Sequence, residues 1–241
     1  MPHVTGTLIN VGTVLAGTAV GTSLGERFPE RIRETVMNGL GLVTLLIGID
    51  AGFAAFRPPL STLTRGSVLI VLGSVLVGGI IGELLRIDPA LTALGDALKR
   101  RFGGGQSRFT EGFVVASLVF CVGPLTILGS LEDGLTGDYS LLAVKSMLDG
   151  FAAMAFASAL GWGVGFSVVT ILIYQGGLSL LAGAVSGVFD EQTIAAITAT
   201  GGVLILAIGL RLLDIRQIRV ANLLPALVIA PVVVAIYANF R

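Results

Sequence analysis

Hydrophobic residues are grouped along this chain in long runs that short polar segments separate. A helix that crosses a bilayer needs about 20 mostly apolar residues. Only Gly161, Trp162 and Gly163 part the fifth run from the sixth, so seven spans is the alternative to eight. The pattern predicts an all-α, polytopic transmembrane bundle that forms a single domain over residues 1–241. The expected spans are residues 4–24, 34–55, 66–85, 110–130, 140–159, 162–185, 193–213 and 220–239.

Composition supports a membrane protein and argues against several other classes. Hydrophobic residues make up 54% of the 241 residues and charged residues only 12%, whereas soluble domains carry about 25% charged residues. The formal net charge is zero, so no nucleic-acid partner is expected. The single cysteine, Cys121, and the single histidine, His3, offer no disulfide, no metal site and no nucleophile–base pair. We therefore expect membrane lipids as surroundings, no enzyme activity and no cofactor.

The basic residues of the loops predict an orientation, because cytoplasmic loops are enriched in Lys and Arg. The even-numbered loops and the C-terminus hold only Arg57, Arg65 and Arg241. The odd-numbered loops are therefore expected in the cytoplasm, with both termini outside. The basic residues of the first, third and seventh loops are Arg27, Arg31, Arg33, Arg86, Lys99, Arg100, Arg101, Arg108, Arg216 and Arg219.

The third loop, residues 87–109, is the only long one. Residues 89–102 predict a short helix, with Asp88 as its N-cap and Pro89 in its first turn. Three leucines share one face of this helix and a basic cluster ends it, which is typical of a helix on the inner membrane surface. The glycines at 103–105 would then form a flexible joint.

Two segments, residues 25–49 and 186–210, align without gaps and share residues at six positions, among them two glycines and two leucine or isoleucine matches. With the orientation above, helices 1–3 and 6–8 would run in opposite senses, in repeat units 1–86 and 162–241. Inverted repeats are typical of many secondary transporters. The alternative is a chance match between Gly- and Leu-rich helices.

Two charged residues, Lys145 and Asp149, lie inside the fifth span. They are four residues apart and therefore share one helix face. An unpaired charge near the bilayer centre costs at least about 2.5–3.5 kcal/mol, and such residues usually mark a path for an ion or a substrate. The alternative is a structural role, in which the two charges neutralise each other.

The fourth span contains Gly123 followed by Pro124. Proline removes a backbone hydrogen bond and clashes with the preceding turn, so a kink or break is expected here. Broken helices near the membrane midplane expose backbone groups that bind ions. A packing kink without further function is the alternative, since proline is tolerated in transmembrane helices.

Further polar residues extend the candidate path. Asn10 is central in the first span, and Tyr174 and Gln175 are central in the sixth; their polar groups must find partners in other helices. Glu111 lies at the inner end of the fourth span, close to Arg108. An acidic outer loop follows at residues 129–138 and could attract cations to an entrance.

Several motifs together resemble the YqgA/YdfK-like family of bacterial membrane proteins. They lie in order over nearly the whole chain, at residues 6–13, 29–32, 121–124, 128–130, 145–150 and 174–176. The resemblance implies a bacterial inner-membrane protein that is transport- or permease-like. It implies neither a substrate nor the role of any residue.

The residues and the resemblance lead to one main expectation. The chain should be a small secondary transporter or channel for an ion or small solute, and its glycine-rich helices favour a homo-oligomer, most simply a dimer. The alternative is a non-transporting membrane scaffold or sensor that binds a partner protein. The expected path residues are Asp149, Lys145, Asn10, Gln175, Tyr174, Gly123, Pro124 and Glu111.

Overall fold

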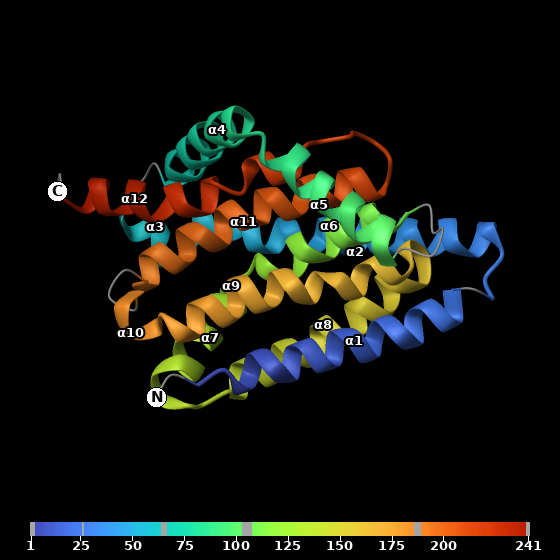
Figure 1. Cartoon of the computed structure of the whole chain (residues 1–241). Coiled ribbons are helices and arrows are strands. Elements are labelled where there is room, and N and C mark those ends of the chain that lie inside the picture. Colours follow the sequence, from blue (N-terminus) through green and yellow to red (C-terminus); the bar gives the residue numbers. More distant parts are fainter. Residues whose placement is uncertain (1–2, 26, 64–66, 103–107, 186–188, 240–241) are drawn as a thin grey trace. The chain divides into compact units, whose positions relative to one another are not determined.

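The computed structural model describes residues 3–25, 27–63, 67–102, 108–185 and 189–239, and every element in them is helical (Figure 1). The elements form two compact units: Met1–Leu40 with Leu91–Val185, called unit 1, and Gly41–Ala90 with Ser186–Arg241, called unit 2. In chain order they are α1 (Thr5–Gly25), α2 (Glu30–Gly52), η1 (Phe53–Phe56), α3 (Leu60–Leu63), α4 (Ser67–Leu85), α5 (Ile87–Phe102), α6 (Phe109–Cys121), α7 (Pro124–Thr136), α8 (Ser140–Leu160), η2 (Trp162–Ser167), α9 (Val168–Leu180), α10 (Ala182–Val185), α11 (Glu191–Leu212), η4 (Val220–Leu223) and α12 (Ala226–Asn239).

Seven helical segments of the described chain are long and apolar enough to cross a membrane. The segments Phe109–Cys121 and Leu125–Thr136 meet at an angle of 64° and add an eighth span if they count as one. Gly161 follows α8 with φ 80°, in the left-handed region that favours glycine, so the fifth and sixth spans are separate helices. The expected all-α bundle of about eight spans is therefore confirmed.

Unit 1 is organised around the pairing of α1 with α8, which lie side by side (Figure 1). Gly17, Gly21 and Gly25 recur at every fourth position of α1 and face α8. A Cβ atom at each would overlap the carbonyl oxygen of a residue on α8, first of Gly150 and then of the residues four and eight positions later. Small residues of this kind let membrane helices approach until their backbones touch.

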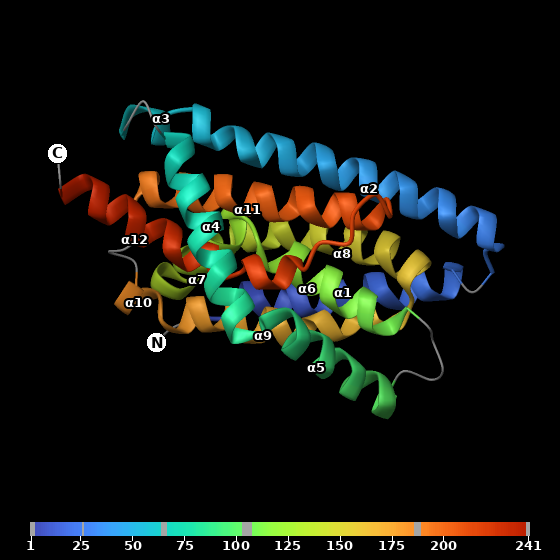
Figure 2. The same cartoon turned by 90° about the horizontal axis from the view of Figure 1, so that it is seen from above.

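In unit 2, α4 crosses α12 and η4 (Figure 2). Gly78 and Gly82 of α4 make this crossing close, because a Cβ atom on either would overlap the backbone of Ala226 or Asn222. The second half of α2 packs against α11 in the same way, through glycines on both helices.

A polar cluster joins the ends of three elements in unit 2. Glu83, in α4, accepts hydrogen bonds from Arg219 Nη1 at 2.6 Å and from Asn222 Nδ2 at 2.5 Å. The Oδ1 atom of the buried Asn222 accepts the backbone N–H of Asp88 at 2.7 Å. One asparagine thus holds η4 against both the end of α4 and the first turn of α5.

The predicted short helix of the third loop is present as α5, but it begins at Ile87. Asp88 therefore lies within the first turn, and its prediction as the N-cap is wrong, whereas Pro89 does lie in that turn. Farther along, Gly95 packs against Thr110 of α6, whose hydroxyl donates to Asp96 Oδ1 at 2.6 Å. The expected joint at 103–105 lies outside the described residues.

Candidate functional site

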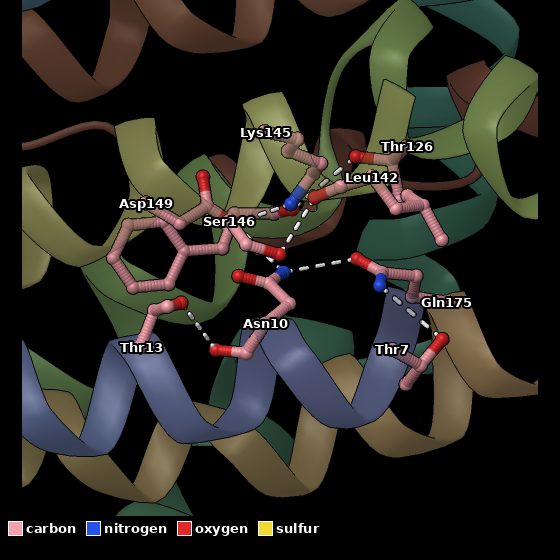
Figure 3. A network of polar contacts seen from close by, with 10 residues as sticks. Thr7, Asn10, Thr13, Thr126, Leu142, Lys145, Ser146, Asp149 and Gln175 are labelled. Atoms are coloured by element: carbon pink, nitrogen blue, oxygen red, sulfur yellow. Dashed lines mark hydrogen bonds and ion pairs between the residues drawn. The ribbon is translucent and has the colours of Figure 1, made fainter. Parts of the chain in front are cut away.

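The two charged residues of α8 form a buried ion pair in unit 1 (Figure 3). Lys145 Nζ donates to Asp149 Oδ2 across one helical turn. Only 7% of the Lys145 side chain and 12% of the Asp149 side chain are exposed. The positive charge of Lys145 and the negative charge of Asp149 therefore neutralise each other, as expected from their spacing.

Asn10 of α1 joins this pair to α9. Its Nδ2 group donates to Asp149 Oδ2 at 2.9 Å and to Gln175 Oε1 at 3.0 Å. Gln175 Nε2 donates in turn to Thr7 Oγ1 at 3.2 Å. Asn10, Gln175 and Thr7 are all almost completely buried. The network therefore links three helices through side chains that are shielded from solvent (Figure 3).

The packing of α1 on α8 explains why these side chains meet. Asn10 lies two turns before Gly17 and shares its helix face. Gly17 touches the backbone of Gly150, the residue after Asp149. The short Asn10 side chain can therefore reach the Asp149 carboxylate without an intervening group.

One acceptor of the network has no partner among the described residues. Asn10 Oδ1 is buried and accepts no hydrogen bond, although burying such an atom costs free energy. Asp149 Oδ2, by contrast, accepts from both Lys145 and Asn10. The amide oxygen of Asn10 and the neighbouring carboxylate could together coordinate a cation, or could accept hydrogen bonds from a solute. No group of three or more His, Cys, Asp and Glu side chains in the described part of the chain could hold a metal ion.

The helix break lies beside the ion pair. α6 ends at the buried Cys121, and both α6 and α7 contact α8, the helix that carries the pair. α7 begins at Pro124, so the break expected there is present. Proline stands at the first turn of a new helix, where its missing N–H costs nothing. Gly123 has φ 162°, an extended conformation open to any residue.

The other expected path residues lie outside the hydrogen-bonded network. Tyr174, the neighbour of Gln175, lines an apolar cavity of about 530 Å³ between α9 and the leucines Leu91 and Leu94 of α5. Glu111 lies in the first turn of α6, and among the described residues it forms no ion pair with Arg108.

Sequence reasoning missed two residues of this region. Thr7 belongs to a motif that carried the family resemblance, but no role was predicted for it. Asp133 was expected in a solvated outer loop; the structure extends α7 to Thr136 and buries Asp133 completely. Its Oδ2 atom accepts the backbone N–H of Gly6 at 3.1 Å. The helix that restarts at Pro124 was the available signal, because it carries residue 133 into the bundle.

Comparison with known proteins agrees with these motifs. A family model described as "Protein of unknown function (DUF554)" matches residues 5–235. Over 235 residues the chain is 30% identical to "Uncharacterized membrane protein YdfK" of Bacillus subtilis (strain 168), with 98% of this chain and 97% of the relative covered. Over 232 residues it is 33% identical to "Uncharacterized protein YqgA" of Escherichia coli (strain K12), with 94% of each covered. No solved structure matches. With the candidate spans, the similarity to a bacterial membrane protein identifies a multi-pass membrane protein.

Proposed function

The chain belongs to the DUF554 family of proteins of unknown function, and we propose that it is a small secondary transporter or channel for an ion or small solute. The observation that carries this proposal is the buried pair of Lys145 and Asp149, held by Asn10 beside a broken helix. Charged residues inside membrane spans are costly, and they commonly mark ion and substrate paths. A pair that served packing alone would be replaced by apolar residues at little cost.

The geometry suggests how Asp149 would work. Its Oδ2 atom accepts from both Lys145 and Asn10, so a cation or proton that binds the carboxylate competes with Lys145. Binding would release the ammonium group, and release of the ligand would restore the ion pair. Lys145 thus serves as an internal counter-ion that stabilises the empty state.

Contacts between α2 and α11 support the inverted repeat that alternating access would use. A Cβ atom on Gly48 would overlap Leu206, and one on Gly209 would overlap Leu45. In the sequence alignment, Gly48 matches Gly209 and Leu45 matches Leu206, so the two contacts are reciprocal. Reciprocal contacts are what a two-fold axis between equivalent elements produces.

A second reciprocal pair strengthens this interpretation. Gly41 approaches Leu213, and Gly202, its counterpart in the alignment, approaches Gly52. Rocking of one repeat against the other around a fixed site is a common transport mechanism.

Flux into proteoliposomes tests the proposal directly. The purified full chain would be reconstituted and assayed with protons, monovalent cations and small anions. Asp149→Asn keeps the side-chain shape and removes the ionisable group, and we expect at least a tenfold loss of flux. The matched control is Asp50→Asn, which changes an exposed carboxylate of unit 2 and should retain wild-type flux. Unchanged flux in Asp149→Asn, or no flux of any tested solute by folded wild-type protein, would overturn the proposal.

The enclosure of the ion pair favours a second candidate, a non-transporting membrane scaffold or sensor. Lys145 and Asp149 are almost fully buried and hydrogen-bonded within unit 1. If the pair is sealed in this way, no solute flux is expected. A scaffold or sensor would instead bind a partner protein stably. Identification of one partner that co-purifies with wild-type protein in stoichiometric amount, together with absent flux, would favour this candidate.

Orientation and assembly are part of the proposal. We expect both termini outside the inner membrane and a homodimer. A C-terminal reporter that is active only outside the cytoplasm tests the orientation, and mass measurement of the purified protein in detergent tests the dimer.

A further inference from the structure

Unit 1 contains a second buried carboxylate, Asp133 of α7, which the network around Asp149 does not use. None of its surface is exposed. Its Oδ2 atom accepts the N–H of Gly6, one of the free amides in the first turn of α1. This contact accounts for one oxygen only, since Oδ1 is buried and has no hydrogen-bond partner among the described residues. The hydrogen bond to the first turn of α1 therefore accounts for only one of the two carboxylate oxygens.

Two serines at neighbouring positions, Ser130 and Ser179, also have a buried side-chain oxygen without a hydrogen-bond partner among the described residues. Ser130 lies three residues before Asp133 on the same face of α7, and Ser179 lies on α9. Both residues are fully buried, and neither hydroxyl has a partner among the described residues. Serine in a helix commonly donates to the carbonyl four residues earlier, as the hydroxyls of Ser74 and Ser146 do here. The hydroxyls of Ser130 and Ser179 are instead left available for another ligand.

The three residues come from helices that touch. A Cβ atom on Gly134, the residue after Asp133, would overlap the carbonyl oxygen of Ser179, so the backbones of α7 and α9 are in contact at this level. Gly6 brings α1 to the same place through its hydrogen bond with Asp133. Other buried hydroxyls also lack partners, but the carboxylate distinguishes this cluster. Those other residues are Thr18, Thr22, Ser167 and Thr200.

We propose that Asp133, Ser130 and Ser179 form a buried binding site for a monovalent cation of the size of sodium. A buried carboxylate needs a compensating positive charge or a proton, and no Lys or Arg of the described chain forms an ion pair with Asp133. One carboxylate oxygen and two hydroxyl oxygens are ligands that suit a hard cation. A single negative charge is neutralised by one monovalent ion, whereas a divalent ion would leave a buried positive charge.

The site adjoins the network around Asp149. Gly6, which binds Asp133, precedes Thr7, which accepts from Gln175; Gln175 in turn lies one helical turn before Ser179 on α9. Polar groups thus follow one side of α1 from Asp133 to Asp149. As a statement about the coupling ion, the inference rests on the proposed transport function, but binding itself is testable without any flux.

Thermal unfolding of the purified full chain tests the site. Sodium chloride would replace choline chloride at constant ionic strength and pH, and a ligand that binds only the folded state raises the Tm. We expect a saturable rise, roughly 5 °C or more at a hundred times the Kd. Asp133→Asn should abolish the rise. Ser130→Ala and Ser179→Ala should weaken sodium binding at least tenfold and keep the proposal testable if Asp133→Asn does not fold. Ser74→Ala, which removes a buried hydroxyl bonded to its own helix, is the matched control and should keep the full response.

The outcomes separate this site from the rest of the proposal. Equal Tm values in sodium and choline would overturn it, and so would a stabilisation that depends on pH alone, because a proton would then compensate Asp133. Loss of the sodium response in Asp149→Asn but not in the Asp133 and serine variants would place the cation elsewhere and overturn it too. Sodium binding at Asp133 without flux would leave the site intact and refute only transport.

Discussion

The ion pair of Lys145 and Asp149 leads to a prediction in which a double variant is more stable than either single one. Lys145→Met leaves the Asp149 carboxylate buried with Asn10 Nδ2 as its remaining hydrogen-bond donor. Asp149→Leu leaves the ammonium group of Lys145 without its counter-ion. Removing one member of a buried pair costs about 3–5 kcal/mol, whereas replacing both by apolar residues is often neutral or stabilising.

These free energies convert into measurable shifts. For a chain of this size, 1 kcal/mol corresponds to about 2–4 °C in Tm, so each single variant should lose roughly 6–20 °C. The double variant Lys145→Met/Asp149→Leu should lie within about 5 °C of the wild type. Circular dichroism of the helices, followed during heating of the detergent-solubilised protein, measures all four midpoints. Leu148→Ala, at an exposed neighbour on α8, is the control for truncation without loss of charge.

Two results would refute this reasoning. If Lys145→Met alone keeps the wild-type Tm, then the Asp149 carboxylate reaches water or takes a proton without cost. If the double variant is as unstable as the sum of the single variants, the pair stabilises the fold beyond mutual neutralisation. A stable double variant that has lost flux would mean that the charges serve function and not folding.

Three further predictions use the same assay. Gly21→Ala should lower stability by about 1–3 kcal/mol because its Cβ would overlap α8. The control is Gly12→Ala on the same helix; a Cβ there would have no atom within 4 Å, so this variant should be neutral or slightly stabilising. Equal effects of the two variants would contradict the close packing of α1 on α8. Asn222→Ala should cost about 1–3 kcal/mol, since it leaves the Asp88 amide without its acceptor, whereas the exposed Gln217→Ala should change stability by less than about 0.5 kcal/mol. Gly123→Ala should also lie within about 0.5 kcal/mol, because its backbone is extended and the space is open; a large loss would show that the break depends on glycine.

Hydrophobic run length was sufficient to predict the class, the number of spans and most helix bounds. The spacing of Lys145 and Asp149 predicted their pairing, and the Gly123–Pro124 dipeptide at the start of α7 predicted the break. These features depend on neighbours in sequence or on the thickness of a bilayer, which the chain itself encodes. The position of Asn10 against Asp149 was expected only in general terms, because the sequence does not show which helices are adjacent.

The residues that sequence reasoning placed wrongly depend on where helices end. Acidic residues and glycines around Asp133 predict a solvated loop, yet the helix that starts at Pro124 continues past it. The Asp88–Pro89 pair predicts a cap at Asp88, although α5 begins one residue earlier. Both residues have partners far away in sequence, the amide of Gly6 for Asp133 and the side chain of Asn222 for Asp88, and the sequence alone does not show such partners.

The glycines of α1 connect the packing of the bundle to its chemistry. Ordinary side chains keep helix axes 8–10 Å apart, whereas α1 and α8 approach more closely, and the short side chain of Asn10 donates to Asp149 Oδ2 at 2.9 Å. Gly17 and Gly21 bring the backbones of α1 and α8 into contact, so the amide reaches the carboxylate directly. A larger residue at Gly17 should therefore weaken the hydrogen bond between Asn10 and Asp149 without touching either residue. Motion of α1 relative to α8 would have the same effect. In this network, Asn10 of α1 donates the hydrogen bond that Asp149 receives from outside α8. The glycine face thus sets both the stability of the helix pair and the environment of the buried carboxylate, and any change in how α1 packs on α8 would alter the competition between Lys145 and an incoming cation.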